Sequence, residues 1–188
     1  MNRKIKSSNQ WHQLSLAMLA GLVLFYTVPV LFAGDDPHSN SVPAEVAKMF
    51  SSGNFNHISD IYTTDFIRHH MTDGISMKGI DAMKKYVTDL RQVYPDFHVS
   101  LDGYSAAGKN MVMRWTVTGT NSGPLLLQPG HPDSKTLPPT GKNIKVSGVS
   151  LLRMEGDKIA EEWIYWNHAA VLTQLGFKII PPGNAAGK

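Results

Sequence analysis

The sequence predicts an α+β fold, in which helices cover one face of a mostly antiparallel sheet. Two patterns along the 188 residues support this prediction. Up to Pro95, apolar residues recur every three or four positions, which is the period of an amphipathic helix. After Pro95 they alternate with polar residues, and Gly-containing turns separate the alternating segments, as in β-hairpins. Helices followed by antiparallel strands indicate this class, and a curved sheet backed by helices leaves a pocket between the layers.

Two long helices and a short extended segment are predicted before Pro95. The first helix begins at Pro43, since a proline suits the first helical turn, and it ends at Gly53. A short helical turn follows near residues 58–62, and residues 66–70 are expected to be extended. The second long helix is stopped by Pro95. Its apolar face is formed by Ile80, Met83, Val87, Leu90 and Tyr94.

Four strands and a final helix are predicted after Pro95. In order, they cover residues 97–102, 111–118, 144–154, 159–166 and 167–175. Residues 121–142, between the second and third strands, are rich in Pro and Gly and are expected to form a long loop. The last helix is expected to end at Gly176, because glycine readily adopts the left-handed conformation that closes a helix.

The first 33 residues have the layout of a secretory signal. Three basic residues precede an uncharged run over residues 14–33, and Ala33 offers a small residue for cleavage. The run is also long enough to span a bilayer as a helix, so an uncleaved membrane anchor remains an alternative, and a buried core helix is a third. The first two interpretations both export the rest of the chain, to the periplasm or the exterior.

Composition limits the remaining residues to one domain with short extensions. Residues 34–42 are polar and are interpreted as a linker, residues 43–180 as the domain, and residues 181–188 as a flexible tail. The 18 Lys and Arg residues exceed the 15 Asp and Glu residues only through the three basic residues near the N-terminus. We therefore expect no nucleic-acid partner, and membrane contact only through residues 14–33. The absence of cysteine excludes disulfides, thiol nucleophiles and Cys-ligated metals.

The strand predicted over residues 159–166 carries the densest set of candidate site residues. Glu161, Trp163 and Tyr165 share one of its faces, with Asn167 at its end. This aromatic wall, with a carboxylate and an amide, is suited to line a pocket. The opposite face carries Glu162, Ile164 and Trp166. The alternative interpretation is an ordinary amphipathic strand with core aromatics and a satisfied amide.

Three further polar residues are candidates. His69 and His70 are adjacent, so on an extended backbone they point in opposite directions, and at most one faces a pocket as an acid, base or hydrogen-bond donor. A surface or hydrogen-bonded core histidine is the alternative. Arg114 needs a carboxylate partner if it faces inward and is an ordinary solvated residue if it faces outward. Neither a His-x-His nor a Glu-x-x-His spacing accompanies the histidines, so no metal site is expected.

Six short stretches carry a family resemblance. They are Tyr94-Pro95-Asp96, Arg114-Trp115-Thr116 with the following Gly119 to Gly123, Pro138 to Lys142, Arg153 with Gly156 to Ile159, Glu161-Glu162-Trp163, and Gln174-Leu175-Gly176. In this order and spacing, over about residues 44–178, they resemble the SnoaL-like polyketide cyclases, also called ester cyclases, of the nuclear-transport-factor-2-like superfamily. Together they are specific for the family but not for a reaction.

The resemblance implies a cone-shaped α+β barrel, in which a curved, mostly antiparallel sheet backed by helices surrounds an apolar pocket. Polyketide-cyclising members close a ring by intramolecular aldol condensation without metal or cofactor. They use an aspartate four residues after a tryptophan as general acid and base. Here Asn167 follows Trp163 at that spacing. An amide donates a hydrogen bond to a carbonyl oxygen but takes up no proton at neutral pH, so the adjacent His168 is the first substitute to consider.

The sequence therefore predicts an exported protein that binds a small apolar carbonyl compound. If it is an enzyme, Asn167 polarises the carbonyl while a histidine moves the proton in a cyclisation or isomerisation. The proton-transfer candidates are His69, His70 and His168. The expected ligand contacts are His69, Arg114, Trp115, Trp163 and Tyr165. A non-catalytic binding module is the alternative, and a structural dimerisation domain is a third; a homodimer is expected from the resemblance alone.

Overall fold

The computed structural model describes residues 41–131 and 133–178. The expected leader, most of the linker and the tail beyond residue 180 lie outside the described residues. The elements are α1 (Val42–Ser52), α2 (Ile58–Ile61), β1 (Tyr62–His70), β2 (Ile75–Lys78), α3 (Ile80–Val93), β3 (His98–Ala107), β4 (Asn110–Thr120), β5 (Leu125–Leu126), β6 (Thr136–Leu137), β7 (Asn143–Glu155), β8 (Lys158–Trp166) and α4 (His168–Gln174). In this part of the chain no helix is long and apolar enough to cross a membrane.

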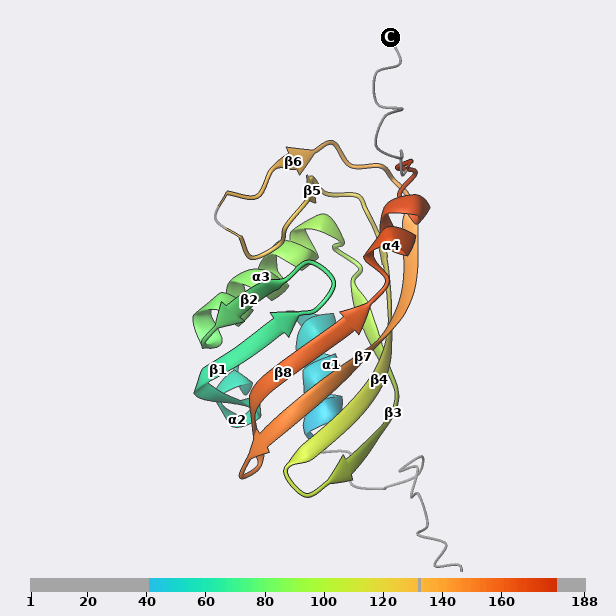
Figure 1. Ribbon diagram of the computed structural model, residues 1–188. Helices are drawn as coiled ribbons and strands as arrows, with labels where there is room; N and C mark the ends of the chain where they lie inside the picture. The colour runs from blue at the N-terminus through green and yellow to red at the C-terminus, as the bar shows by residue number, and fades with distance from the viewer. Residues whose placement is uncertain (1–40, 132, 179–188) are drawn as a thin grey trace, which may run out of the picture. The chain divides into compact units, whose positions relative to one another are not determined.

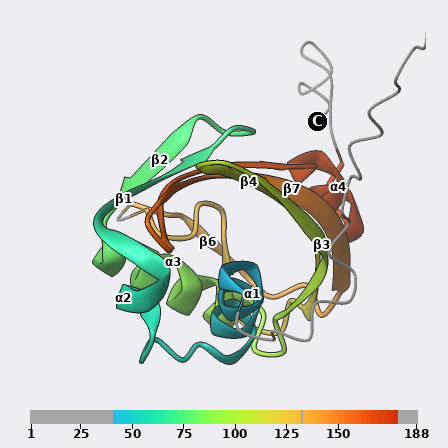
Figure 2. The same cartoon turned by 90° about the horizontal axis from the view of Figure 1, so that it is seen from below.

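A curved six-stranded sheet forms the main layer, in the order β2-β1-β8-β7-β4-β3. All neighbouring strands are antiparallel except β1 and β8, which run parallel (Figure 1). The sheet bends around α1 and α3, which lie on its concave side (Figure 2). The predicted α+β class is thus confirmed, although the sheet remains open and does not close into a barrel.

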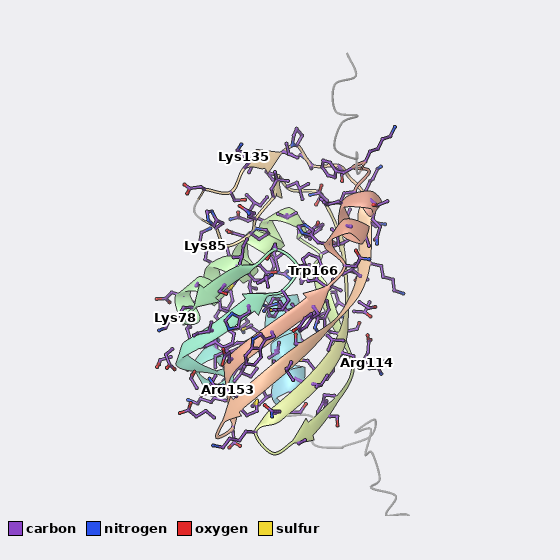
Figure 3. The ribbon with its side chains drawn as sticks, viewed as in Figure 1. Lys78, Lys85, Arg114, Lys135, Arg153 and Trp166 are labelled. Atoms are coloured by element: carbon purple, nitrogen blue, oxygen red, sulfur yellow. The ribbon has the colours of Figure 1, made fainter. Side chains whose placement is uncertain are left out.

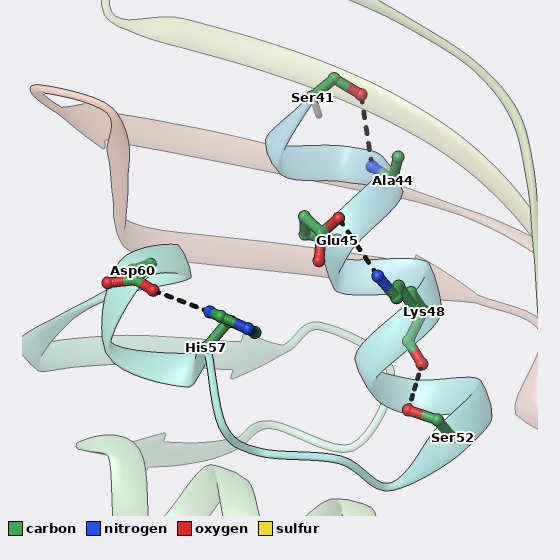
Figure 4. A network of polar contacts seen from close by, with 7 residues as sticks. All are labelled: Ser41, Ala44, Glu45, Lys48, Ser52, His57 and Asp60. Carbon is green, nitrogen blue, oxygen red and sulfur yellow. Dashed lines mark hydrogen bonds and ion pairs between the residues drawn. The ribbon is translucent and has the colours of Figure 1, made fainter. Parts of the chain in front are cut away.

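Helix α1 begins and ends as the sequence predicts. The Ser41 side chain accepts a hydrogen bond from the Ala44 backbone N–H (Figure 4). A proline occupies the first turn. The chain leaves the helix at Gly53, whose φ of 68° lies in the left-handed region. The apolar face of α1 packs against the concave side of the sheet, where Val46, Met49 and Phe50 are buried.

Alternation along the strands separates an inner face from an outer face. On β4, Met113, Trp115 and Val117 are buried, while Val112 before them and Arg114 between them are exposed. The same alternation on β7 and β8 gives the sheet one core-facing side and one solvent-facing side. The position of a residue along its strand therefore decides to which side of the sheet its side chain points.

Three short elements were not predicted. The first is β2, which pairs with β1 as a hairpin. Strand β1 itself was expected but begins at Tyr62, four residues earlier than predicted. Strands β5 and β6 form a two-stranded sheet within the expected loop over residues 121–142. The β2, β5 and β6 segments are only two to four residues long, which is too short to show a clear period in the sequence.

Candidate functional site

A largely apolar cavity lies between the inner face of the sheet and the helices. It has a volume of about 80 Å³. Its apolar walls come from α1, α3, α4 and four strands. They include Val46, Phe50, Leu90, Phe97, Val99, Met113, Val117, Ile144, Ile164 and Val171. The polar side chains that reach this cavity are few, so their positions decide which ligand chemistry it accepts.

A line of polar side chains crosses the inner face at this cavity. Arg68 on β1 and Glu162 on β8 are direct partners in the parallel register, and their Nη1 and Oε2 atoms form an ion pair of 3.3 Å. Ser150 Oγ on β7 donates to Glu162 Oε1 at 2.6 Å. Trp115 Nε1 on β4 donates to Ser150 Oγ at 3.1 Å. Four neighbouring strands thus contribute one polar group each, all of them buried.

The Trp115 indole reaches Ser150 only because residue 148 of β7 is a glycine. Gly148 is the register partner of Trp115, and a Cβ atom at this position would lie 2.3 Å from the Trp115 ring. No real contact is that short, so a side chain here would push the indole away from Ser150. The glycine therefore allows the indole to lie flat across β7.

The buried arginine is held charged by its surroundings. Its Cζ atom lies 5.1 Å from the ring centroids of both Phe50 and Tyr86, which are cation–π distances. Burial by itself opposes the charge, but the Glu162 carboxylate, followed by Tyr86 and Tyr62, raises the pKa of Arg68 above its ordinary value. The same burial raises the pKa of Tyr86, so its hydroxyl stays protonated.

The polar line has unused hydrogen-bonding capacity. Glu162 Oε2 lies within ion-pair distance of Arg68 but is not aligned for a hydrogen bond, and Arg68 Nε has no partner among residues 41–131 and 133–178. A buried polar atom without a partner costs about 1–3 kcal/mol. A ligand oxygen or a water molecule in the cavity would relieve that cost.

Two predicted site residues lie on the inner face. Trp115 is buried, lines the cavity and bonds Ser150, as described above. His70 is also buried and points inward from the end of β1, but it lines a second cavity rather than the first. Desolvation, followed by the Arg68 and His168 charges, lowers the pKa of His70 to about 3, so its imidazole is neutral at physiological pH.

Four predicted ligand contacts lie on the outer face, and their expected positions require correction. Trp163 and Tyr165 alternate with the cavity residues of β8, and Tyr165 is 49% exposed. His69 stacks on Trp163 with a centroid distance of 5.6 Å. Arg114, labelled in Figure 3, is exposed and donates to the Asp102 carbonyl oxygen. It lies on the side of β4 opposite to Trp115. None of these four side chains lines the apolar cavity.

The outer-face histidine belongs to a surface cluster. His69 Nε2 lies 2.9 Å from Glu161 Oε1, and its Nδ1 lies 2.9 Å from Ser76 Oγ. Arg153 Nε donates to the other oxygen of Glu161 at 3.0 Å. The hydrogen bond with His69, and then that with Arg153, lowers the pKa of Glu161 below its usual range.

Asn167 has a structural role at the start of α4. Its Oδ1 accepts the Ala170 backbone N–H at 2.9 Å, which caps the helix. It is exposed and borders only a shallow hollow on the surface. His168 stacks on Trp166 with a centroid distance of 5.2 Å and borders both this hollow and the second cavity. The sequence analysis expected Asn167 at the pocket, but the structure does not place it at the apolar cavity.

The sequence interpretation missed Arg68 and Glu162 as site residues. A signal existed in the alternation, because Glu162 shares a face with Ile164, and Arg68 shares one with Phe66. The aromatic residues on the other face of β8 outweighed it. No group of three or more His, Asp or Glu side chains in the described residues is arranged to hold a metal ion.

The fold and cavity define a class of α+β proteins in which a curved sheet wraps around an apolar cavity. A family model, described as SnoaL-like polyketide cyclase, matches residues 42–175. The chain belongs to this family, as its sequence motifs indicated. No curated protein matches the sequence.

Solved structures share this fold at low sequence identity. A proposed SnoaL-like polyketide cyclase from a Jannaschia species is 20% identical with a TM-score of 0.59, over 77% of this chain and 99% of that one. A proposed polyketide cyclase from Acidithiobacillus ferrooxidans is 25% identical with a TM-score of 0.57, over 72% and 95%. AclR from Streptomyces galilaeus, a proposed hydroxylase, is 20% identical with a TM-score of 0.59, over 75% and 83%.

Proposed function

We propose that the protein binds a small, largely apolar carbonyl compound in the inner cavity. The observation that carries this proposal is the pairing of apolar walls with one polar line whose Arg68 Nε and Glu162 Oε2 atoms have no hydrogen-bond partner in the described part of the chain. A carbonyl oxygen is an acceptor that an arginine N–H can satisfy. The apolar walls disfavour a ligand with a net charge, since its desolvation would be uncompensated.

The Glu162 Oε2 atom, which has no hydrogen-bond partner in the described part of the chain, favours a second candidate function. This function is proton-transfer catalysis without a cofactor. In this reaction Glu162 takes a proton from the carbon next to the ligand carbonyl, and the electron pair moves onto the carbonyl oxygen as an enolate. The charged Arg68 guanidinium stabilises that oxygen. The protonated Glu162 then returns the same proton to another carbon, so that substrate and product are isomers. General acid–base help of this kind contributes about 10²–10⁴-fold.

Family membership is compatible with either candidate. One neighbour is described as a proposed hydroxylase and others as proposed polyketide cyclases, so this fold hosts different reactions. The Asn167 side chain accepts a backbone hydrogen bond as a helix cap and takes no part in the proposed step. The proposal therefore rests on the inner polar line and not on the family's aspartate position.

A small unsaturated ketone tests both candidates in one assay. Cyclohex-3-enone converts to its conjugated isomer by the proton shift described above, and the conjugated enone absorbs strongly in the ultraviolet. We expect the wild-type protein to bind this ketone and to accelerate its isomerisation. Glu162→Gln should keep the shape of the site and abolish the acceleration. Glu161→Gln, on the outer face, is the matched control and should behave as wild type.

The outcomes separate the candidates. Binding without acceleration would leave a binding module and remove the catalytic candidate. No binding of the ketone, measured by calorimetry at concentrations up to its solubility, would contradict the proposal. Acceleration that survives in Glu162→Gln would exclude the assigned role of this carboxylate.

We also propose that residues 1–33 export the domain, because a basic start followed by an uncharged run is typical of signal peptides and anchors. Expression of the full chain, followed by cell fractionation and N-terminal sequencing, tests this. A full-length protein recovered only from the cytoplasm would contradict it.

A further inference from the structure

A second cavity lies beside the first and differs from it in its polar groups. It has a volume of about 70 Å³ and is bordered by β1, α3, the segment over residues 125–129 and α4. Apolar side chains such as Leu125, Leu126 and Leu175 form much of its wall. Its polar side chains are His70, Asp73, Tyr86, Tyr94, Gln128, Trp166 and His168. Arg68 and Glu162 border only the first cavity.

Side chains that the two cavities share form the partition between them. Five residues border both: Tyr86, Leu90, Tyr94, Trp166 and Val171. Three of the five are aromatic, so much of the partition consists of rings, whose orientation depends on rotation about side-chain bonds. Trp166 lies near the end of β8 that leads into α4 (Figure 3).

Each cavity has its own buried polar atoms without partners. The first has Arg68 Nε and Glu162 Oε2; the second has His70 Nε2, and Trp166 Nε1 belongs to the partition. None of these atoms has a hydrogen-bond partner among the residues that the structure describes. His70 is only 5% exposed, so bulk water does not satisfy it. Unpartnered groups in both cavities require polar partners at two separate places, supplied by water or by a ligand.

We propose that the two cavities are the two halves of one binding site, which takes an elongated neutral ligand with an oxygen at each end and an apolar middle. One oxygen meets Arg68 and Glu162, and in this respect the inference rests on the proposed function. The other oxygen accepts a hydrogen bond in the second cavity from His70 Nε2 or Trp166 Nε1. The apolar middle crosses the partition.

The chemistry of the second half favours a neutral oxygen there. Burial keeps His70 uncharged at physiological pH, with its pKa lowered to about 3, so it offers no positive charge to an anion. The indole N–H of Trp166 is a donor only, and a neutral imidazole presents one N–H. A carbonyl or hydroxyl oxygen accepts from such donors without bringing a charge into the apolar space. Ordered water is the competing occupant, and the experiment must distinguish it.

A series of linear diketones of increasing length, each with its matching monoketone, provides the probes. The dissociation constant of each is measured by calorimetry with the intact protein. We expect at least one diketone to bind about three- to tenfold more tightly than its monoketone, because one added hydrogen bond contributes roughly 0.5–1.5 kcal/mol. Shorter diketones, which cannot reach both polar ends, should show no such gain.

Two variants assign the gain to the second cavity. His70→Phe removes the imidazole nitrogens and keeps a ring, and Trp166→Phe removes only the indole N–H and part of the ring. In at least one of them, the diketone should bind no more tightly than its matching monoketone measured with the same variant. The matched control is His69→Phe, which changes the adjacent histidine on the outer face and should leave the gain intact.

The wild-type series decides the proposal even if a variant does not fold. A monoketone that binds, with no diketone binding more tightly at any length, would overturn the two-part site and leave the proposed function in place, because water would then suffice for His70. A gain that both variants retain would also overturn it. Failure of every ketone to bind would contradict the proposed function and this inference together.

Discussion

Two adjacent glutamates on β8 show how differently the two faces of the sheet are used. Glu162 is 2% exposed and meets Arg68 and Ser150 beside an apolar cavity. Glu161 lies on the solvent side and meets His69 and Arg153. Each carboxylate has one basic neighbour, and the second neighbour is a hydroxyl for Glu162 and an imidazole for Glu161. Only Glu162 is almost fully buried and lies next to the apolar cavity.

The difference teaches that burial, and not the list of partners, separates a candidate site from a surface network. A buried ion pair is expensive to form and more expensive to break, whereas a surface pair is screened by water and salt. The outer face still contains exposed apolar side chains next to its charges. They are Val112, Val149, Leu151 and Tyr165.

The largest effect that separates the faces should come from breaking the inner ion pair. Arg68→Met leaves the Glu162 charge buried and unpaired, which should lower the free energy of unfolding by about 3–5 kcal/mol. Arg153→Met, its counterpart on the outer face, should cost at most about 1 kcal/mol. Urea denaturation of both variants measures the two values. Equal losses would show that the inner pair is no more desolvated than the outer one.

Two adjacent leucines on β7 provide the next comparison. Leu152 is completely buried, while Leu151 is 37% exposed. Leu152→Ala should lower the free energy of unfolding by about 2–5 kcal/mol, because it removes buried methyl groups and leaves a cavity. Leu151→Ala should change it by about 0.5 kcal/mol or less. A larger loss for Leu151 would mean that the outer face is covered, for example by a second chain.

The buried histidine should make stability depend on pH. Because the pKa of His70 is about 3 in the folded protein and about 6.5 when unfolded, the unfolded chain takes up the proton first. The contribution of neutral His70 to the free energy of unfolding is complete above pH 6.5. As the pH falls towards 3, the free energy of unfolding decreases by up to about 1.4 kcal/mol per pH unit. Denaturation at a series of pH values should show a shallower slope for His70→Phe than for wild type. Exposed His57, changed to Phe, is the control, and an unchanged slope in His70→Phe would contradict the assigned burial.

The smallest effect concerns Asn167, where the structure gives a capping role in place of a catalytic one. Asn167→Ala should cost about 1 kcal/mol through loss of the cap, while Asn167→Asp should stay within a few tenths, because aspartate caps helices equally well. Thermal unfolding compares the two variants. A gain of isomerase activity in Asn167→Asp, in the ketone assay above, would instead indicate that this position acts on the ligand.

Much of the fold was predictable because it is encoded locally. Ser41, Pro43 and Gly53 bound the first helix, and the change of period at Pro95 separates helices from strands. The parallel pairing of β1 with β8 was not predictable, because it joins residues about ninety positions apart and leaves no local pattern. That pairing is what brings Arg68 next to Glu162.

The site was predicted less well, for a physical reason. Alternation divides β8 correctly into two faces, but it does not say which face is buried. Trp163 and Tyr165 suggested the wrong face, since aromatic residues usually mark a core. Alternation grouped Trp115 with the apolar residues of its strand, and it is buried with them, whereas for His69 and His70 the sequence left open which of the two points inward.

The central claim is that ligand binds on the inner face, and methyl NMR tests it most directly. With a cyclic ketone added to protein labelled at Ile, Leu and Val methyl groups, the shifted signals should belong to the cavity. These residues are Val46, Val99, Val117, Ile144 and Ile164. The signals of Val112, Val149 and Leu151 on the outer face should stay unchanged. Shifts confined to those outer residues, or no shifts at any ketone concentration, would contradict the account.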